Sequence, residues 1–470
     1  LVVAAVLGHV HAILSNANIN LCDLDPCTCP GDRGRVVCDC STSQTKDINL
    51  RTIDRAHLFI NFGSITINNC SRVHVERKAL ASLSALRQIT FINIKNLILE
   101  SNAFNWLTDD PNSHNGVTIN ITNVFISEIP SYTFEGTLHK IILQNVTVRN
   151  IRSFAFASLT HTDIIEFRDC TFLSIDAQAF KRFSTNYVMI IGTNFSSDLV
   201  TRTMVDIEVK HDLKFQNVKF NSIQSSALKI RGPQRFTILD CKIDFISSKA
   251  FDIAMRGDVN IQDNTFMNII TSAFSEITIE RKYFQEFGKQ KLSFKNNTIN
   301  LFETNSLAFN TTNFDPIIDS LLIDRSCSCP ETAAWLTDLY PSNSHTPNKN
   351  YDLSGDIYCK NVGSVRSIKN FQKLFCGGKT TSLYIIVALV VGTLVTLLVI
   401  GAIIFFGYRR TVKRYINVPT SPSLKIPADP GKGLMMVVPE GRTYRETELH
   451  VIVEHAEPIT PMEYVGNVIN

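Results

Sequence analysis

A phrase of side chains that recurs between residues 65 and 310 constrains the fold more than any other feature of this sequence. It reads apolar-x-apolar-x-[Asn/Asp]-x-x-apolar-x-x-apolar-x-x-x-Ala-Phe, and its clearest copy runs from Ile165 to Phe180. Other copies begin at Ile65, Ile89, Ile119, Ile141, Leu213, Phe236, Val259 and Leu292, and a copy around Val188 is degraded. Most copies follow one another at about 22 to 25 residues, and the interval stretches to about 30 before Val124 and about 33 before Asn297.

Each copy predicts one coil of a solenoid. The apolar-x-apolar start predicts a short strand with alternating faces. The later apolar residues come at irregular intervals, which suits the turns of a coil better than one amphipathic helix. One coil of this length cannot bury its own apolar side, so we expect about ten coils to stack over a continuous core, with a parallel sheet along one edge. At about 4.8 Å per strand, that sheet is about 50 Å long.

The phrase resembles that of the leucine-rich-repeat family, L-x-x-L-x-L-x-x-N-x-L followed by an apolar residue and often by Ala-Phe. The resemblance covers most of residues 46–325. It implies an α/β-type solenoid dominated by parallel β-structure, in the form of a leucine-rich-repeat horseshoe. A right-handed parallel β-helix is the rival architecture, because its coils have a similar length. The cysteine-rich flanks favour the leucine-rich repeat.

One column of the repeat departs from the family pattern. Where the family usually carries Asn or Cys, this chain has Cys70, Ile94, Val124, Val146, Cys170, Val218, Cys241, Asn264 and Asn297. With only two asparagines, side-chain bonds cannot satisfy the turn backbone in most coils. The preceding column is Asn69, Asn93, Asn123, Asn145, Asp169, Asn217, Asp240, Asp263 and Asn296. This column either caps the turn itself or faces solvent, and we expect a bent strand end with the column at least partly exposed.

Two cysteine clusters flank the repeats. Cys22, Cys27, Cys29 and Cys38 look like the N-terminal cap of extracellular leucine-rich-repeat proteins, and Cys327, Cys329, Cys359 and Cys376 look like the C-terminal cap. Such caps cover the apolar surface of the end coils. The resemblance implies the pairs Cys22–Cys29, Cys27–Cys38, Cys327–Cys359 and Cys329–Cys376. Zinc binding by the Cys-x-Cys pairs is the alternative, which an oxidising compartment disfavours.

Four cysteines lie outside these pairs. Cys170 and Cys241 belong to the column that runs from Cys70 to Asn297, which we call the ladder column. We expect both to be buried thiols. Cys40 and Cys70 are candidates to pair across the first coil.

An uncharged apolar segment predicts that the chain spans a membrane. Leu383 to Phe406 is 24 residues without a charge, which as a helix covers about 36 Å, enough to cross a hydrocarbon core of about 30 Å. The basic cluster Arg409, Arg410, Lys413 and Arg414 follows and should stay in the cytoplasm. All 12 cysteines precede the segment, as do six glycosylation sequons, at Asn69, Asn120, Asn145, Asn194, Asn296 and Asn310. We therefore expect a single-pass type I plasma-membrane glycoprotein with an extracellular N-terminus.

The predicted division of the chain follows from these features. It comprises a signal-peptide remnant (1–15), an N-terminal cysteine cap (16–45), the repeats (46–325), a C-terminal cysteine cap (326–376), a stalk (377–382), a transmembrane helix (383–407) and a disordered cytoplasmic tail (408–470). In the tail, Tyr464 is a candidate for phosphorylation and for docking a cytoplasmic adaptor.

The sequence favours binding over catalysis. A net charge of +3 does not predict a nucleic-acid partner. We find no catalytic motif, so we expect no enzyme activity, no cofactor and no metal site. Binding is the default use of an exposed solenoid sheet. The outward ligand-binding candidates are Glu166, Arg168, Lys214, Gln216, Asn260, Gln262 and Lys295.

These features predict a receptor or adhesion protein with an extracellular protein or glycan ligand. A structural scaffold of the extracellular matrix or of cell junctions is the alternative. A parallel β-helix carbohydrate-active protein is a more distant one. The oligomeric state stays open.

Overall fold

The computed structural model describes residues 22, 25–29, 34–51, 62–81, 83–106, 116–339, 357–361, 363–376 and 378–412. The predicted signal-peptide region, most of the predicted cytoplasmic tail with Tyr464, residues 107–115 and residues 340–356 of the predicted C-terminal cap lie outside these ranges. The chain divides into two units, Leu1–Ile386 and Val387–Asn470, which are described separately.

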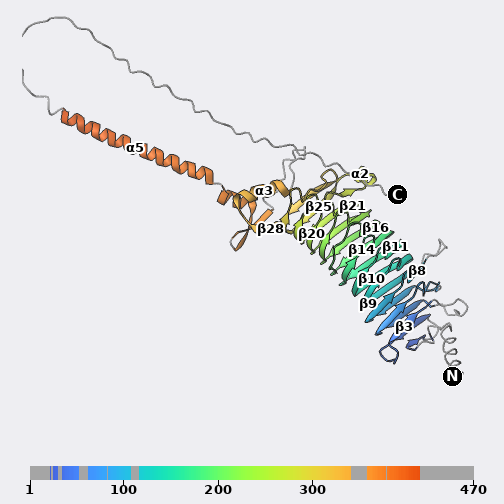
Figure 1. The fold of residues 1–470 in the computed structure, drawn as a ribbon. Coiled ribbons are helices and arrows are strands. Elements are labelled where there is room, and N and C mark those ends of the chain that lie inside the picture. Colours follow the sequence, from blue (N-terminus) through green and yellow to red (C-terminus); the bar gives the residue numbers. More distant parts are fainter. Residues whose placement is uncertain are drawn as a thin grey trace, which may run out of the picture. The chain divides into compact units, whose positions relative to one another are not determined.

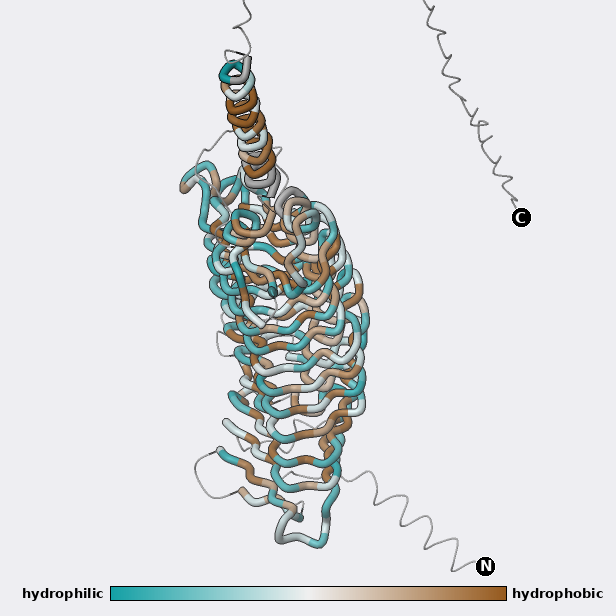
Figure 2. Tube along the Cα trace, turned by 90° about the vertical axis from the view of Figure 1, so that its left-hand side faces the viewer, coloured by the Kyte–Doolittle hydropathy of each residue, from teal (hydrophilic) through white to brown (hydrophobic). Residues whose placement is uncertain are grey.

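The first unit is a parallel β-solenoid of about 11 turns (Figure 1). Its strands form three series of parallel neighbours, so that each complete coil contributes one stretch to each of three sheets. In Figure 2 the coils follow one another as rungs, and hydrophobic and hydrophilic residues alternate along them.

Sheet 1 corresponds to the predicted strand. It contains β2 (Arg35–Asp39), β4 (Ser64–Asn68), β6 (Gln88–Ile92), β9 (Val117–Ile129), β10 (Phe134–Ile151), β12 (Thr162–Arg168), β14 (Phe180–Ile191), β16 (Met204–Gln216), β19 (Arg235–Leu239), β22 (Asp258–Gln262), β25 (Gln290–Lys295) and β27 (Phe314–Asp319).

Sheet 2 follows the first corner of each coil. It contains β3 (Asp47–Leu50), β5 (Arg72–Val75), β7 (Asn96–Leu99), the ends of β9 and β10, β13 (Thr171–Ile175), β15 (Asn194–Phe195), β17 (Lys219–Ile223), β20 (Lys242–Ile246), β23 (Thr265–Ile269), β26 (Thr298–Phe302), β28 (Leu321–Ser326) and β29 (Ile357–Asn361).

Sheet 3 follows the second corner and leads into the next coil. It contains β8 (Phe104–Trp106), the starts of β10, β14 and β16, β11 (Phe156–Thr160), β18 (Leu228–Arg231), β21 (Phe251–Met255) and β24 (Ile277–Ile279).

The remaining elements lie at the ends of the solenoid, between β24 and β25, and after the last coil. β1 (Cys27–Thr28) pairs antiparallel with β2, and β30 (Ser364–Ser367) pairs antiparallel with β29. The helices are α2 (Arg281–Phe287), α3 (Cys329–Leu339), α4 (Ile368–Phe371), a π-helical turn η5 (Gln372–Cys376) and α5 (Gly378–Val412).

The presence of three sheets corrects the expectation of one sheet along one edge. Phe172 and Ile175 are buried residues of a sheet 2 strand, and Phe180 begins the stretch that belongs to sheet 3. The spacing of these residues is irregular because the strands are short and a corner residue interrupts the alternation at each turn of the coil. The irregularity therefore reflects corners between strands and not a loss of β-structure.

The first corner is the Asn/Asp column. All nine of its residues have φ between 51° and 58° and are exposed, in agreement with a bent strand end that faces solvent. Asn and Asp tolerate this left-handed conformation better than other side chains with a Cβ. In the degraded copy the corner is Gly192, where an added Cβ would lie 2.1 Å from Asp169 Oδ1.

Exposed side-chain amides link the first coils at this corner. Asn69 Nδ2 donates to Asp39 Oδ1 at 3.1 Å, Asn93 to Asn69 at 3.1 Å, Asn123 to Asn93 at 3.0 Å, and Asn145 to Asn123 at 2.7 Å. Hydrogen bonds from Ser41, followed by those from Asn69, lower the pKa of Asp39 below its usual value.

The core is continuous along the stack. Phenylalanines at one position of sheet 3 stack from coil to coil, with ring centroids 5.3 Å apart for Phe104 and Phe134 and 4.6 Å apart for Phe134 and Phe156 and for Phe156 and Phe180. In the ladder column, Asn264 and Asn297 are buried, and each donates to a backbone carbonyl, that of Ile238 or Ile261, at 2.9 Å. These two asparagines satisfy backbone groups that apolar residues at the same position cannot.

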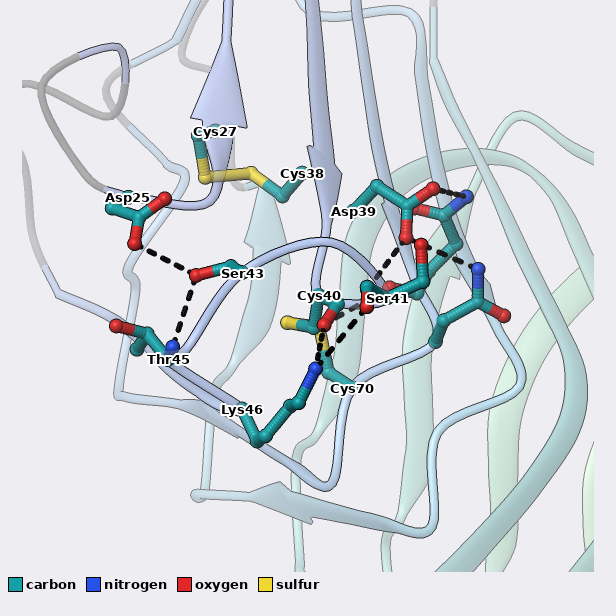
Figure 3. The surroundings of a disulfide bond; sticks show 12 residues. Asp25, Cys27, Cys38, Asp39, Cys40, Ser41, Ser43, Thr45, Lys46 and Cys70 are labelled. Atoms are coloured by element: carbon teal, nitrogen blue, oxygen red, sulfur yellow. Dashed lines mark hydrogen bonds between the residues drawn. A yellow bond between two sulfur atoms is a disulfide. The ribbon is translucent and has the colours of Figure 1, made fainter.

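Disulfides lie at both ends of the solenoid. The structure contains Cys22–Cys29, Cys27–Cys38, Cys327–Cys359 and Cys329–Cys376, which are the four pairs that the family resemblance implies. A fifth, Cys40–Cys70, joins two successive coils beside Lys46, which donates to the carbonyls of Cys40 and Ser41 (Figure 3). Cys170 and Cys241 are free and buried.

Candidate binding surface

All seven predicted ligand-binding residues lie on the outer face of sheet 1. Glu166 and Arg168 come from β12, Lys214 and Gln216 from β16, Asn260 and Gln262 from β22, and Lys295 from β25. Their inward neighbours, such as Phe167, Phe215 and Ile261, are buried, which fixes the outward direction of the candidates. The candidates do not form one cluster, because β14 separates β12 from β16 and β19 separates β16 from β22.

Strand β14 fills the gap between the first two candidate pairs with apolar side chains. Met189 lies between Glu166 and Lys214 in the strand register, and Ile191 lies between Arg168 and Gln216. Tyr187, on the same face, pairs in register with Ile164 of β12. Ile142 of β10 is the register partner of Glu166 on the other side. The outcome is a half-buried apolar cluster that crosses three neighbouring strands.

We define the sheet 1 patch as these five apolar side chains together with three charged ones. Its members are Ile142, Ile164, Tyr187, Met189, Ile191, Glu166, Arg168 and Lys214.

The charges of the patch are only partly compensated. Glu166 and Arg168 form an ion pair on one strand, with Arg168 Nε 2.9 Å from Glu166 Oε1. The side chain of Lys214 has no ion pair or hydrogen bond with another described residue of the solenoid, and the same is true of the side chain of Gln216. The patch therefore combines apolar area, a neutralised pair and one cation that is available to a partner.

Sequence reasoning missed the apolar members of the patch. The copy around Val188 lacks the Asn/Asp corner, which hides the register of its strand and so the outward side chains. The signal was nevertheless present: Val188 and Ile190 point inward and are buried, so Tyr187, Met189 and Ile191 must point outward.

The sequons fall at different places on the solenoid. Asn69, Asn145 and Asn296 lie in the exposed first corner, Asn194 lies in β15 of sheet 2, and Asn310 precedes β27. Asn120 is different, because it lies on the outer face of sheet 1 and pairs in register with Ile142 of the patch. A glycan on Asn120 would cover one edge of the patch.

Other places offer less for binding or chemistry. A hollow of about 570 Å³ lies at the second corner, lined by Ser153, Ser174, Asp176, Asp198 and neighbours, and it is wide open. Within the described ranges, no group of three or more His, Cys, Asp or Glu side chains is placed to hold a metal ion. Burial raises the pKa of the Cys170 thiol to about 11 and that of Cys241 to about 12, so neither is a ready nucleophile near neutral pH.

The apolar segment forms one long helix. Within α5, Ile385–Arg410 is long and apolar enough to cross a membrane, and none of its most apolar window is buried.

Comparison with known proteins adds no assignment. No protein-family model matches the chain, and no curated protein matches it significantly.

Proposed function

We propose that this chain is a membrane-anchored cell-surface receptor or adhesion protein that binds a protein ligand through the sheet 1 patch. The observation that carries the proposal is the patch itself, which joins methionine, isoleucine and tyrosine side chains with an uncompensated lysine on one rigid sheet face. Protein interfaces are enriched in aromatic residues, methionine and arginine, and methionine adapts its shape to a partner.

Two features support an extracellular, anchored solenoid. Five disulfides in one unit are typical of an oxidising compartment. The apolar stretch Ile385–Arg410 follows the last disulfide in the chain, and two arginines lie at its end, as positively charged residues do on the cytoplasmic side of a span.

The leucine-rich-repeat affiliation is part of this proposal. The repeat phrase, the buried Asn264–Asn297 ladder and the disulfide pairs at both ends support it. The three-sheet coil favours the parallel β-helix cross-section instead: if all three sides repeat at about 4.8 Å, no wide convex side remains to bend the stack into a horseshoe. We therefore propose leucine-rich-repeat sequence features on a β-helix-like coil.

A glycan is the second ligand class, because parallel β-helices include carbohydrate-active proteins. The three sheets per coil are the observation that favours it. The composition of the patch favours the protein ligand, since apolar side chains beside a cation are typical of protein interfaces. Neither class of ligand implies that the chain is an enzyme.

The test is a binding screen of the secreted extracellular portion, fused to an Fc dimer, against cells, purified surface proteins and a glycan array. Each hit is repeated with Met189→Asp and Lys214→Glu, both on sheet 1. Met267→Asp in β23 and Lys219→Glu in β17 are matched controls on the outer face of sheet 2. We expect the sheet 1 variants to lose binding while the controls retain it. Equal binding by all four variants would refute the patch.

A further inference from the structure

The C-terminal cap carries exposed apolar side chains that no described residue covers. Leu374 is 67% exposed, Val365 54% and Phe375 54%. Among the large apolar side chains described between residues 22 and 361, only Phe287 is comparably exposed, at 55%. Phe375 precedes Cys376, whose disulfide to Cys329 fixes this end of the segment to α3. The exposed side chains therefore belong to a stapled element of the fold.

Three cations lie in the same stretch of chain as these apolar side chains. Arg366 lies over the Phe375 ring, 5.5 Å from its centroid, and Phe375 stacks on the buried Phe371 at 5.1 Å. Lys369 and Lys373 are exposed nearby in the chain. The stretch 363–376 contains these three cations and no carboxylate.

A hollow lies in the same surface. Its volume is about 520 Å³, and Tyr358, Val365, Arg366, Lys369 and Leu374 are among its lining residues. It therefore offers both an apolar wall and two cationic side chains to one ligand. We name the group Val365, Arg366, Lys369, Lys373, Leu374 and Phe375 the cap patch.

The chain itself brings a membrane close to the cap patch. Helix α5 begins at Gly378, and its membrane-spanning candidate begins at Ile385. Seven residues of helix advance about 10 Å, and two more residues reach Cys376 within about 7 Å. The headgroup region on each side of a hydrocarbon core is itself about 5 to 8 Å thick. If α5 spans a membrane, this chain length keeps Cys376 within about 17 Å of the hydrocarbon, so the cap patch can reach the lipid headgroups.

We propose that the cap patch is a membrane-interface site, in which Leu374 and Phe375 enter the boundary between headgroups and acyl chains while Arg366, Lys369 and Lys373 pair with lipid phosphates. Basic residues interleaved with exposed leucine and phenylalanine are typical of surfaces that lie in this interface. The inference rests on the proposed membrane span of α5. It adds that the cap is a second point of attachment, which restrains the solenoid at the bilayer.

The experiment uses the full chain in phosphatidylcholine nanodiscs that contain a lipid with a nitroxide near its carbonyl groups. Leu374→Trp reports on the cap patch, and Leu173→Trp is the control, because Leu173 is exposed on sheet 2. The unsubstituted chain gives the background from Trp106 and Trp335. We expect the lipid nitroxide to quench the emission of the tryptophan introduced in the cap patch several-fold more than that of the control, and aqueous acrylamide to quench it less.

Each other outcome has a distinct meaning. Acrylamide quenching equal to that of the control, without lipid quenching, would place the cap patch in water and overturn the proposal. Shielding from both quenchers would show that protein covers the patch, such as residues 340–356 or a second copy, and would also overturn it. Co-elution of the chain with the lipid discs is measured separately and tests the membrane span of α5. A chain that does not co-elute with the discs would refute that span, and not the cap patch alone.

Charge reversal separates lipid contact from simple proximity. In the Leu374→Trp background, Arg366→Glu with Lys373→Glu should lower the lipid quenching several-fold, and Lys219→Glu, an exposed lysine of sheet 2, should not. Unchanged quenching after the double charge reversal would refute the role of the cations.

Discussion

Replacing Asn297 by valine should weaken the solenoid locally by an amount that follows from three hydrogen bonds. The Asn297 side chain accepts from the backbone N–H of Asn264 at 2.9 Å and from Asn264 Nδ2 at 3.0 Å, and it donates to the carbonyl of Ile261 at 2.9 Å. Asn297 is fully buried, so water cannot replace these bonds. Valine occupies the equivalent position in other coils, at Val146 and Val218, so its volume should be accommodated.

The change in the free energy of local opening is the cost of leaving three buried groups without a partner, less a small gain from burying apolar methyl groups. Each unsatisfied buried group costs about 1 to 3 kcal/mol. The buried methyl groups of valine return about 1 kcal/mol. The net loss is about 2 to 8 kcal/mol in the free energy of local opening, and its lower end already corresponds to roughly 30-fold faster amide exchange.

Hydrogen exchange read by mass spectrometry measures this directly on peptides that contain Asn264 and Ile261. Asn260→Val is the matched control, because Asn260 lies outward in the same coil and its side chain makes no hydrogen bond with another described residue. Adding Asn264→Val to Asn297→Val should cost about 1 kcal/mol less than the sum of the single changes, because the orphaned Asn264 amide is then absent. Exchange in Asn297→Val as slow as in the control would refute the reasoning.

Four further predictions concern cysteines and a sequon. Replacing Cys40 and Cys70 by alanine should lower the stability of the N-terminal coils by about 3 to 4 kcal/mol, because the disulfide closes a loop of 30 residues. Urea denaturation of the N-terminal region checks this. An unchanged midpoint would count against the disulfide. Cys170 and Cys241 should resist a thiol reagent in the native chain and yield two thiols after denaturation. The pKa values of these thiols in the folded chain, about 11 and 12, exceed the ordinary thiol pKa of 9.0. Their contribution to stability is therefore complete below pH 9 and is lost as the pH rises through the folded pKa values. A stability that is flat from pH 9 to 11 would contradict this. Asn120→Gln should remove one glycan by mass and strengthen ligand binding at the sheet 1 patch, whereas Asn194→Gln on sheet 2 should remove a glycan without that gain.

The coil and its stacking could be predicted because the repeat phrase records burial directly. In Ile165-Glu166-Phe167, two buried side chains flank an outward one, and the same alternation recurs in each copy. The exposed corner could also be predicted, since Asn and Asp mark it in nine coils.

The second corner, and with it the third sheet, could not be predicted from local preference. Its left-handed residues include Tyr132, Phe154 and Gln178, whose side chains carry no preference for positive φ. Stacking imposes the conformation: Tyr132 N–H donates to Phe154 O at 2.7 Å, and Phe154 N–H donates to Gln178 O at 2.8 Å. These bonds exist only between coils, so no short stretch of sequence contains them.

The candidate surface was predictable in part for the same reason. Polar outward residues such as Lys214 could be found wherever the repeat is regular. Met189 and Ile191 could not be distinguished from core residues by their chemistry, and only the register with Val188 and Ile190 shows that they face outward.

Register cross-linking tests the three-sheet solenoid most directly. One pair of cysteine substitutions is placed on the outer face of each sheet, at residues paired in register: Glu166 and Met189 in sheet 1, Lys219 and Lys242 in sheet 2, and Lys229 and Asp252 in sheet 3. Neighbouring strands lie about 4.8 Å apart, within the range that a disulfide spans. The account predicts a new disulfide-linked peptide for all three pairs. It predicts none when the second cysteine of the sheet 1 pair is placed at the inward position Ile190 and not at Met189. Cross-links in sheet 1 alone would contradict it.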